Sequence, residues 1–309
     1  MRPRFISLIT LALCAFGLSA AVAADEPAGG TPAYRPVRNF ITLPEGVKLG
    51  AVSGVATDSR DNFYLFHRGD PAKPVLVFDK SGAFLRSFGD GLFISTHGLR
   101  IDPDGNVWCT DSENHTVVKF SPEGKVLMTL GERDVKGEDE RHFNRPTDVG
   151  FAANGDVYVS DGYGNSRVVK FGKSGKFLLA WGKKGTGPGE FDAPHQVRLD
   201  SKGDVYVADR ENKRIQVFTP DGKFIRQLGE GIAPYGLFIT PNDELFVADG
   251  LKHEIVKLDK SGTILLRWGG GGREPGKFFL PHGLHVDHNG AVYVGEITNA
   301  RAQKFVPEN

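Results

Sequence analysis

The chain has 309 residues, including 40 glycines and 22 phenylalanines, and its 38 basic residues balance 38 acidic ones. A balanced charge offers no attraction to nucleic acid or to an acidic membrane surface, so we expect neither as a partner. A chain of this length would often fold as two domains, but internal repeats would make one large domain possible.

The first segment of the chain, residues 1–24, is predicted to be a secretory signal peptide. Arg2 and Arg4 precede an apolar run that starts at Phe5 and ends near residue 20, and small residues follow at 21–23. Such a run is too short and wrongly flanked for a membrane span. Residues 25–36, rich in Gly, Pro and Ala, are predicted to form a flexible leader, and residues 37–309 the folded domain. We therefore expect a secreted or periplasmic protein with no membrane association once the signal is removed.

Six related units follow one another along the folded domain. Each has one aligned residue just ahead of a short strand in which apolar and polar residues alternate. By subtraction, these residues are 44, 50, 48, 40 and 47 positions apart. The aligned residues are Ser53, His97, Thr147, His195, Tyr235 and His282.

Within each unit, four short strand-like segments are separated by turns rich in Gly, Asn and Asp, such as residues 102–105 and 201–204. Four antiparallel strands in forty to fifty residues are typical of a β-propeller blade, and the sequence of every unit resembles the NHL repeat. The sixth unit stops after three strands, and residues 37–43 can supply its outer strand. The sequence therefore predicts an all-β, six-bladed β-propeller closed by an N-terminal strand, which leaves no exposed sheet edge.

Three of the aligned residues are histidines, and they fall on alternate units. Because the first strand of each blade lines the central channel, His97, His195 and His282 should lie roughly 120° apart around the axis of a six-bladed ring. Three neutral imidazoles around one point form a tridentate metal site of the kind that holds catalytic zinc. The alternative is that each histidine caps a strand or binds water in the channel. Zinc is favoured by all-imidazole ligation, while copper, nickel or iron stay open.

The loops between the second and third strands should open on the same face as the histidines. Arg68 follows the second strand of the first unit, Arg210 takes the equivalent place in the fourth, and Tyr163 lies in the loop of the third. An arginine suits a carboxylate or a developing anion, and a tyrosine beside cations can serve as a base. The alternative treats Arg210 and Arg214 as solvated loop charges.

Several segments, in this order along the chain, resemble those of the peptidyl-α-hydroxyglycine α-amidating lyase family. The resemblance covers nearly all of the chain after the leader and implies a six-bladed propeller with catalytic zinc held by the three histidines. The segments are HRGD at 67–70, HGL at 97–99, FNRPTDV at 143–149, SDGYGNSR at 160–167, PH at 194–195, DREN at 209–212 and PH at 281–282.

The same resemblance implies roles for the three loop residues. Tyr163 would be the catalytic base, Arg68 would assist, and Arg210 would lie beside the substrate. The implied reaction splits a peptidyl-α-hydroxyglycine, a carbinolamide, into a peptide amide and glyoxylate. We therefore predict a zinc-dependent carbon–nitrogen lyase, monomeric, whose partner is a small-molecule or peptide carbinolamide.

Two features of the family pattern are missing from this chain. Animal members carry cysteine pairs, and Gly164 stands where one of those cysteines falls. Family members also bind a structural calcium ion through two backbone carbonyls and an aspartate directly after the third histidine. The matching carbonyls here belong to Val55 and Leu99, but Gly283 replaces the aspartate, so the expected calcium site lacks its acidic ligand.

Two other functions fit a six-bladed propeller. One is a non-catalytic NHL propeller that binds a protein or a glycan, although such a platform has no need of histidines on alternate blades. The other is a lactonase-like hydrolase, which would hold calcium with Glu, Asn and Asp in the channel, where this chain has histidines. The remaining histidines, His285 among them, are expected at the surface, and Trp108, Trp181 and Trp268 are expected to pack between blades.

Overall fold

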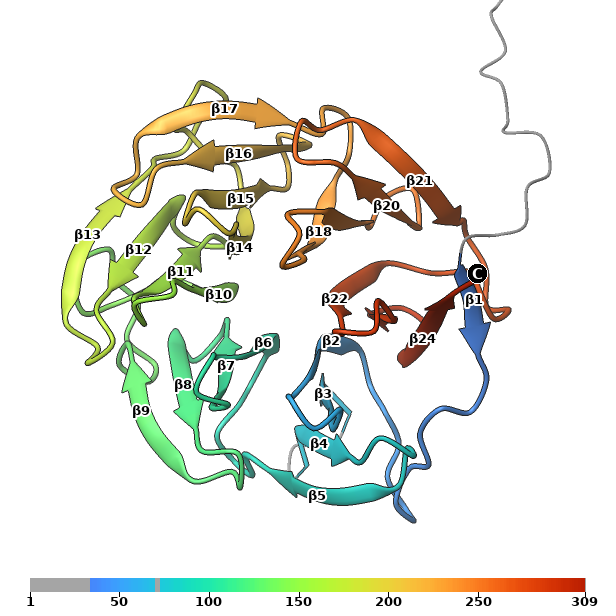
Figure 1. Ribbon diagram of the computed structural model, residues 1–309. Helices are drawn as coiled ribbons and strands as arrows, with labels where there is room; N and C mark the ends of the chain where they lie inside the picture. Colours follow the sequence, from blue (N-terminus) through green and yellow to red (C-terminus); the bar gives the residue numbers. More distant parts are fainter. Residues whose placement is uncertain (1–33, 70–72, 309) are drawn as a thin grey trace, which may run out of the picture. The chain divides into compact units, whose positions relative to one another are not determined.

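The computed structural model describes residues 34–69 and 73–308, which lie within one compact unit of the chain. The predicted signal peptide and most of the predicted leader fall outside the described residues. The described chain contains 24 β-strands and no helix, arranged as six four-stranded sheets around a central axis (Figure 1). The predicted all-β, six-bladed propeller is therefore confirmed. Among these residues there is no helix of the length and apolar character needed to cross a bilayer.

Each of the first five blades is an antiparallel meander of four consecutive strands. Blade 1 contains β2 (Val52–Thr57), β3 (Phe63–His67), β4 (Val75–Phe78) and β5 (Phe84–Phe88). Blade 2 contains β6 (Thr96–Ile101), β7 (Val107–Asp111), β8 (Thr116–Phe120) and β9 (Val126–Leu130). Blade 3 contains β10 (Asp148–Phe151), β11 (Val157–Asp161), β12 (Arg167–Phe171) and β13 (Phe177–Trp181). Blade 4 contains β14 (Pro194–Leu199), β15 (Val205–Asp209), β16 (Arg214–Phe218) and β17 (Phe224–Leu228). Blade 5 contains β18 (Pro234–Ile239), β19 (Leu245–Asp249), β20 (Glu254–Leu258) and β21 (Ile264–Gly269).

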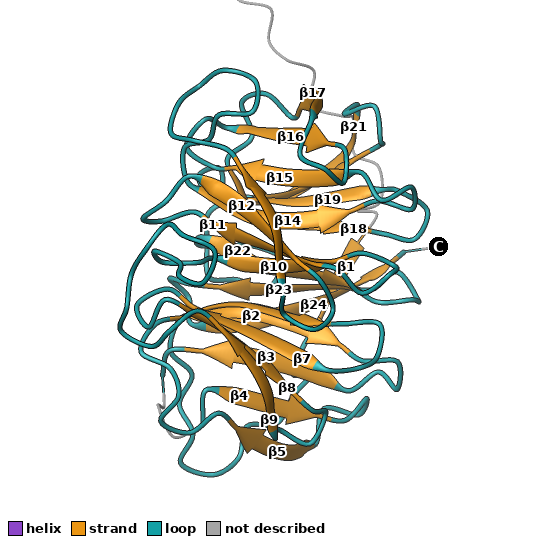
Figure 2. Cartoon of the chain, turned by 90° about the vertical axis from the view of Figure 1, so that its left-hand side faces the viewer, coloured by secondary structure: helices purple, strands orange, loops and turns teal. Residues whose placement is uncertain are grey.

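The sixth blade joins the two ends of the described chain. It contains β22 (Pro281–Val286), β23 (Val292–Glu296) and β24 (Arg301–Pro307), and its outer strand is β1 (Tyr34–Val37). The first strand of every blade lines the channel and the fourth lies at the perimeter (Figure 1). Seen from the side, the connecting loops gather on the two opposite faces of the ring (Figure 2).

The closing strand forms earlier in the chain than predicted. Residues 34–37, not 37–43, pair with β24, so β1 includes three residues assigned to the leader. The reason is aromatic packing: the Tyr34 ring stacks on Trp268 of blade 5 at 4.7 Å, with the ring planes 13° apart. Phe40 instead leaves the sheet and packs edge-on against Phe63 and Tyr293, between blades 1 and 6.

The hydrophobic core is divided into clusters that lie between neighbouring blades. Trp108 and Val117 of blade 2, for example, pack against Val149 and Val157 of blade 3. Trp181 similarly meets Phe218 of the next blade, which confirms the expected position of these indoles. Because both faces of a blade are covered, its inner strands are buried throughout, which fixes the channel-lining strands rigidly around the axis.

Candidate active site

Three imidazoles meet at one end of the channel, as predicted. His97 lies in β6, His195 in β14 and His282 in β22, and their ligand nitrogens all lie within 4.8 Å of one another. The ring centroids are 4.7, 4.7 and 4.8 Å apart, and each ring is at most 3% exposed. The alternative that each histidine caps its own strand does not explain this convergence.

The backbone of the following blade orients each imidazole. His97 Nδ1 lies 2.6 Å from the carbonyl oxygen of Thr147, His195 Nδ1 2.8 Å from that of Tyr235, and His282 Nδ1 2.8 Å from that of Ser53. A carbonyl can only accept a hydrogen bond, so each Nδ1 carries the proton and donates it. The lone pair of each Nε2 is then left for a ligand, the arrangement that metal-binding histidines use.

The three side chains are also held neutral. Burial lowers the pKa of His97 well below its usual value, and the neighbouring His282 and Arg68 lower it further. Burial has the same effect on the pKa of His195, and it lowers that of His282 to about 3. Three neutral nitrogen donors facing one point fit a zinc-like cation with an open coordination position. The donor set alone is equally compatible with other imidazole-binding metals.

Tyr163 lies in the loop between β11 and β12, and its hydroxyl reaches the imidazoles. The Tyr163 oxygen is 2.9 Å from His97 Nε2 and 3.1 Å from His195 Nε2. Two glycines permit this approach: a Cβ on Gly162 would lie 1.9 Å from the Pro194 carbonyl oxygen, and one on Gly164 would lie 2.1 Å from the side chain of Asn144. The structure thus places the predicted base beside the predicted metal ligands.

Arg210 is not a solvated loop charge. Its Nη1 donates to the Tyr163 hydroxyl oxygen at 3.0 Å, and its guanidinium lies between the Tyr163 and Tyr235 rings, at 5.0 and 4.8 Å from their centroids. Arg214, the other arginine of this loop, is also buried and pairs with Asp209 at 2.8 Å, so it has a structural role. The cation beside the tyrosine oxygen is therefore Arg210.

Arg68 lies on the rim of the same site, directly after β3. Its Nε donates to the carbonyl oxygen of Thr96 at 2.9 Å, one residue before the first histidine. The preceding residue, His67, is buried, and its Nδ1 accepts the N–H groups of Gly50 and Gly69, which holds the loop in place. The Arg68 side chain is thus anchored through Nε to the backbone beside the first histidine.

Some residues of the site were missed from the sequence. Tyr235 acts through its carbonyl on His195 and through its ring on Arg210. Arg145 lies 5.4 Å from the Tyr163 ring centroid, and its Nη2 donates to Glu113 at 2.6 Å. Tyr235 could have been found, since it is the only ring among the non-histidine aligned positions, whereas the place of Arg145 depends on loop geometry.

The prediction for His285 was wrong. This residue does not lie on the outer surface but lines the channel in β22, where its Nε2 is 2.8 Å from the Thr57 hydroxyl oxygen. It borders a cavity of about 460 Å³ at the mouth opposite to the three-histidine site. The strand pattern suggested a solvent-facing residue, because a polar position in an alternating strand usually faces water.

The residues matched to calcium include no acidic ligand. The Leu99 carbonyl oxygen already accepts a hydrogen bond from Arg100 Nη1 at 2.9 Å. Gly283 brings no carboxylate, and a Cβ there would lie 3.0 Å from the Ser53 carbonyl oxygen. Val55 is fully buried in the core between blades 6 and 1. The predicted calcium site is therefore not supported by the residues present.

Comparison with known sequences agrees with these features. The NHL repeat matches residues 95–120, 143–171 and 191–218. A probable peptidyl-alpha-hydroxyglycine alpha-amidating lyase of Caenorhabditis elegans is 34% identical over 242 residues, covering 70% of this chain and 68% of that protein. The chain belongs to the peptidyl-α-hydroxyglycine α-amidating lyase family of NHL-repeat proteins.

Other relatives differ in length and in name. Peptidylglycine alpha-amidating monooxygenase of Rattus norvegicus is 35% identical over 337 residues, but this chain spans only 34% of its length. NHL repeat-containing protein 3 of Homo sapiens is 34% identical over 288 residues and is covered to 80%. The chain thus spans about a third of the monooxygenase relatives and most of the shorter ones.

Solved structures share the fold of this family member at low sequence identity. A streptogramin B lyase superposes with a TM-score of 0.65 at 14% identity, over 89% of this chain and 97% of that one. A gluconolactonase of Xanthomonas campestris gives 0.64 at 13% identity, over 92% and 99%. Likeness at this identity shows the propeller alone.

Proposed function

We propose that this chain is a zinc-dependent lyase that cleaves the C–N bond of peptidyl-α-hydroxyglycine-like carbinolamides to an amide and glyoxylate. The observation that supports this most is the contact of the Tyr163 oxygen with two of the three convergent imidazoles and with Arg210. Relatives named as amidating lyases point to the same reaction class. A binding platform would not need a phenol oxygen at that place.

His97, His195 and His282 would hold the zinc ion through Nε2, because their Nδ1 atoms are engaged by backbone carbonyls. When bound, zinc supplies Lewis acidity that makes a substrate hydroxyl more acidic. The burial of the three rings excludes competing water from that side of the site.

The remaining chemistry belongs to the side chains. Tyr163 takes the proton of the carbinol hydroxyl, the carbinol carbon forms a C=O bond, and the C–N bond breaks. The electron pair of that bond goes to the nitrogen, which takes up the proton from Tyr163 and leaves as the amide. Atoms balance without another reactant. Arg210 donates a hydrogen bond to the Tyr163 oxygen, and Arg68 binds the carboxylate that leaves as glyoxylate.

The cellular setting of this reaction is also a proposal. The predicted signal peptide supports export to the periplasm or the medium. We propose a monomer whose only partners are carbinolamide substrates, small or peptidyl, bound on the loop face that carries Tyr163. Fractionation of cells that express the full chain, followed by size-exclusion chromatography, tests both points.

The proposed function is tested by glyoxylate release from α-hydroxyhippurate, with metal content measured on the same sample. We expect about one zinc per chain, because the residues that the structure describes contain one tridentate site, and we expect turnover that depends on this zinc. Bound zinc without glyoxylate release would contradict this substrate class. Absence of both would favour the non-catalytic propeller.

A further inference from the structure

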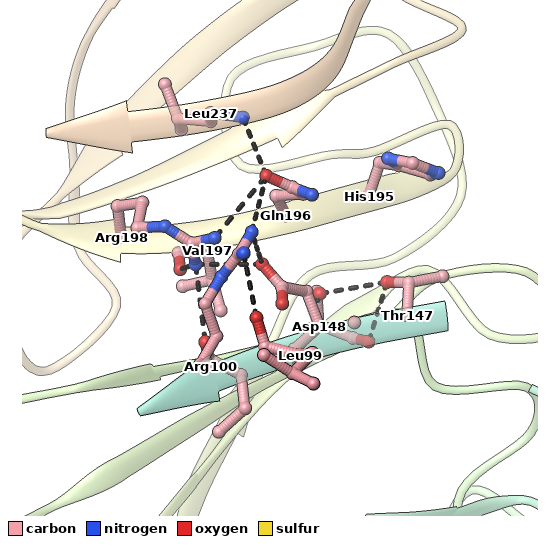
Figure 3. Close-up of polar contacts among 12 residues, drawn as sticks. Leu99, Arg100, Thr147, Asp148, His195, Gln196, Val197, Arg198 and Leu237 are labelled. Carbon is pink, nitrogen blue, oxygen red and sulfur yellow. Dashed lines mark hydrogen bonds and ion pairs between the residues drawn. The ribbon is translucent and has the colours of Figure 1, made fainter. Parts of the chain in front are cut away.

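A second polar layer crosses the channel below the histidines. Arg100 and Arg198 follow His97 and His195 by three residues, and they are 7% and 8% exposed. His195 and Arg198 lie toward opposite ends of the part of β14 shown in Figure 3, with the guanidinium groups gathered around Asp148. The buried polar groups of this layer are not used by the proposed reaction.

The two guanidinium groups hydrogen-bond to a ring of backbone carbonyls. Arg100 Nη1 donates to Leu99 O at 2.9 Å, and Arg198 Nη1 donates to Val197 O and, at 3.3 Å, to Val149 O. Leu99, Val149 and Val197 each lie two residues after the aligned residue of their blade, as does Val55. The arginine N–H groups therefore bind carbonyl oxygens at the repeat position to which the family pattern assigns calcium ligands.

The charges of this layer match those of a coordinated divalent cation. Asp148 Oδ2 lies 3.1 Å from Arg100 Nη2 and 2.8 Å from Arg198 Nη1 (Figure 3). A divalent cation with one aspartate has the same net charge as two guanidinium cations with one carboxylate. Gly98 leaves space for the Asp148 carboxylate, because a Cβ at position 98 would lie 2.5 Å from Asp148 Oδ1.

Gln196 extends the layer to a fourth blade. Its Oε1 accepts Arg100 Nη2 at 2.9 Å, Arg198 Nη2 at 3.4 Å and the backbone N–H of Leu237 at 2.6 Å. The hydrogen bonds thus connect β6, β10, β14 and β18, which are the channel-lining strands of blades 2 to 5.

We infer that the paired guanidinium groups of Arg100 and Arg198 take the place of the family's structural calcium ion and tie blades 2 to 5 together around the axis. Two buried guanidinium cations would repel a calcium ion, Leu99 O already accepts a hydrogen bond from one of them, and Gly283 offers no carboxylate. The stability of this chain is therefore independent of calcium. The inference rests on the family pattern and on these contacts, not on the lyase activity.

The wild-type protein gives the primary test. Calcium and zinc are measured together in protein purified without added calcium, and thermal unfolding is followed in calcium-free buffer and in millimolar calcium. The buffer is cleared of calcium by resin before the protein is added, since a chelator would also bind zinc. We expect no bound calcium and an unchanged Tm. Calcium near one equivalent, or a Tm that rises by several degrees with calcium, would overturn the inference whatever the zinc content is.

Variants test whether the guanidinium groups have the structural role. Arg100→Met removes one of the two guanidinium partners of Asp148 and the Nη1 donor to the Leu99 carbonyl, and it should lower Tm by about 6 °C or more. Arg60→Met is the matched control, because the Arg60 side chain is 70% exposed, and it should change Tm by less than about 2 °C. Equal Tm values for the two variants would overturn the role of Arg100.

A milder substitution covers the case in which Arg100→Met gives no soluble protein. Arg198→Lys keeps the charge but loses the planar set of donors that reaches Val149 and Val197 together. It should lower Tm by at least about 3 °C and remain indifferent to calcium. A wild-type Tm in Arg198→Lys would show that the guanidinium geometry is not what holds the blades.

Discussion

The Tyr163 hydroxyl can be removed without disturbing the rest of the site, so Tyr163→Phe is the most direct test of the mechanism. Its oxygen has three polar neighbours, His97 Nε2 at 2.9 Å, His195 Nε2 at 3.1 Å and Arg210 Nη1 at 3.0 Å. Phenylalanine keeps the ring that stacks against Arg210 and Arg145, at 5.0 and 5.4 Å. The loss of a general base costs about 10²–10⁴-fold in kcat. That range corresponds to about 2.7–5.4 kcal/mol in the activation free energy.

The assay is steady-state glyoxylate release, with zinc content measured in the same preparation. Tyr163→Phe should keep its zinc, because the hydroxyl is not one of the three imidazole donors, and KM should change by less than about threefold. The control is Tyr158→Phe in the same blade. The Tyr158 hydroxyl donates a hydrogen bond to the Pro220 carbonyl at 3.2 Å and not to the imidazoles. A kcat within threefold of wild type for Tyr163→Phe would refute the assigned base. Loss of zinc together with turnover would assign the hydroxyl to metal binding instead.

Four further outcomes follow from the site and the fold. His195→Ala should lose zinc and turnover together, since two imidazoles remain; retained zinc in metal analysis would contradict the ligand set. Arg68→Met should raise KM about 10–100-fold with little change in kcat, because the lost carboxylate contact is present in ground and transition states alike. Burial, and then the guanidinium of Arg100, lower the pKa of His285 in the folded protein to about 3. As pH falls below about 6.5, the imidazole is protonated in the unfolded chain but not in the folded one, so the folded state loses stability. Denaturant titrations should show that His285→Gln loses about 1–2 kcal/mol less free energy of unfolding than wild type between pH 6.5 and 4.5. The expected difference is below the full linkage value because part of the ring faces the cavity. The same pH slope in the variant and in wild type would contradict this. Tyr34→Ala should lower the free energy of unfolding by about 2 kcal/mol through the lost stack on Trp268, and a loss no larger than that of the exposed neighbour Arg35→Ala would contradict the closure.

Because the chain repeats, most of the ring and the convergence of the three histidines could be predicted from the sequence. The aligned residue occupies the same place in every blade, so the spacing of His97, His195 and His282 on alternate units was sufficient to bring them together. Tyr163 and Arg210 were predictable from the equivalent loops, because all loops between second and third strands open on one face. The geometry follows from repetition, and no long-range packing had to be guessed.

What could not be predicted depends on contacts between segments that are distant in sequence. Residues 37–43 suit an outer strand as well as residues 34–37 do, and the stack of Tyr34 on Trp268 decides between them. Pro36 argues against a strand in the sequence, yet the outer strand of a blade has a free edge where proline is tolerated. Polar residues of an alternating strand usually face water, but Arg100 and Arg198 are buried because the polar side of these strands faces the channel.

The two polar layers of the channel have one structural cause. In a regular strand, residues three apart point to opposite faces, so a histidine and the arginine three positions later could not both turn toward the axis. The pairing of β6 with β7 and of β14 with β15 contains an irregularity next to the histidine, which places one extra residue in the channel strand. A bulge of this kind shifts the alternation by one residue and re-aims the side chain beside it. The glycines that follow His97 and His282 are the sequence signal for it, since an isolated glycine in a strand often marks a bulge. The same irregularity therefore turns His97 and His195 toward one point in the channel and lets Arg100 and Arg198 meet below them, so the candidate metal site and the guanidinium layer depend on one feature of the strand.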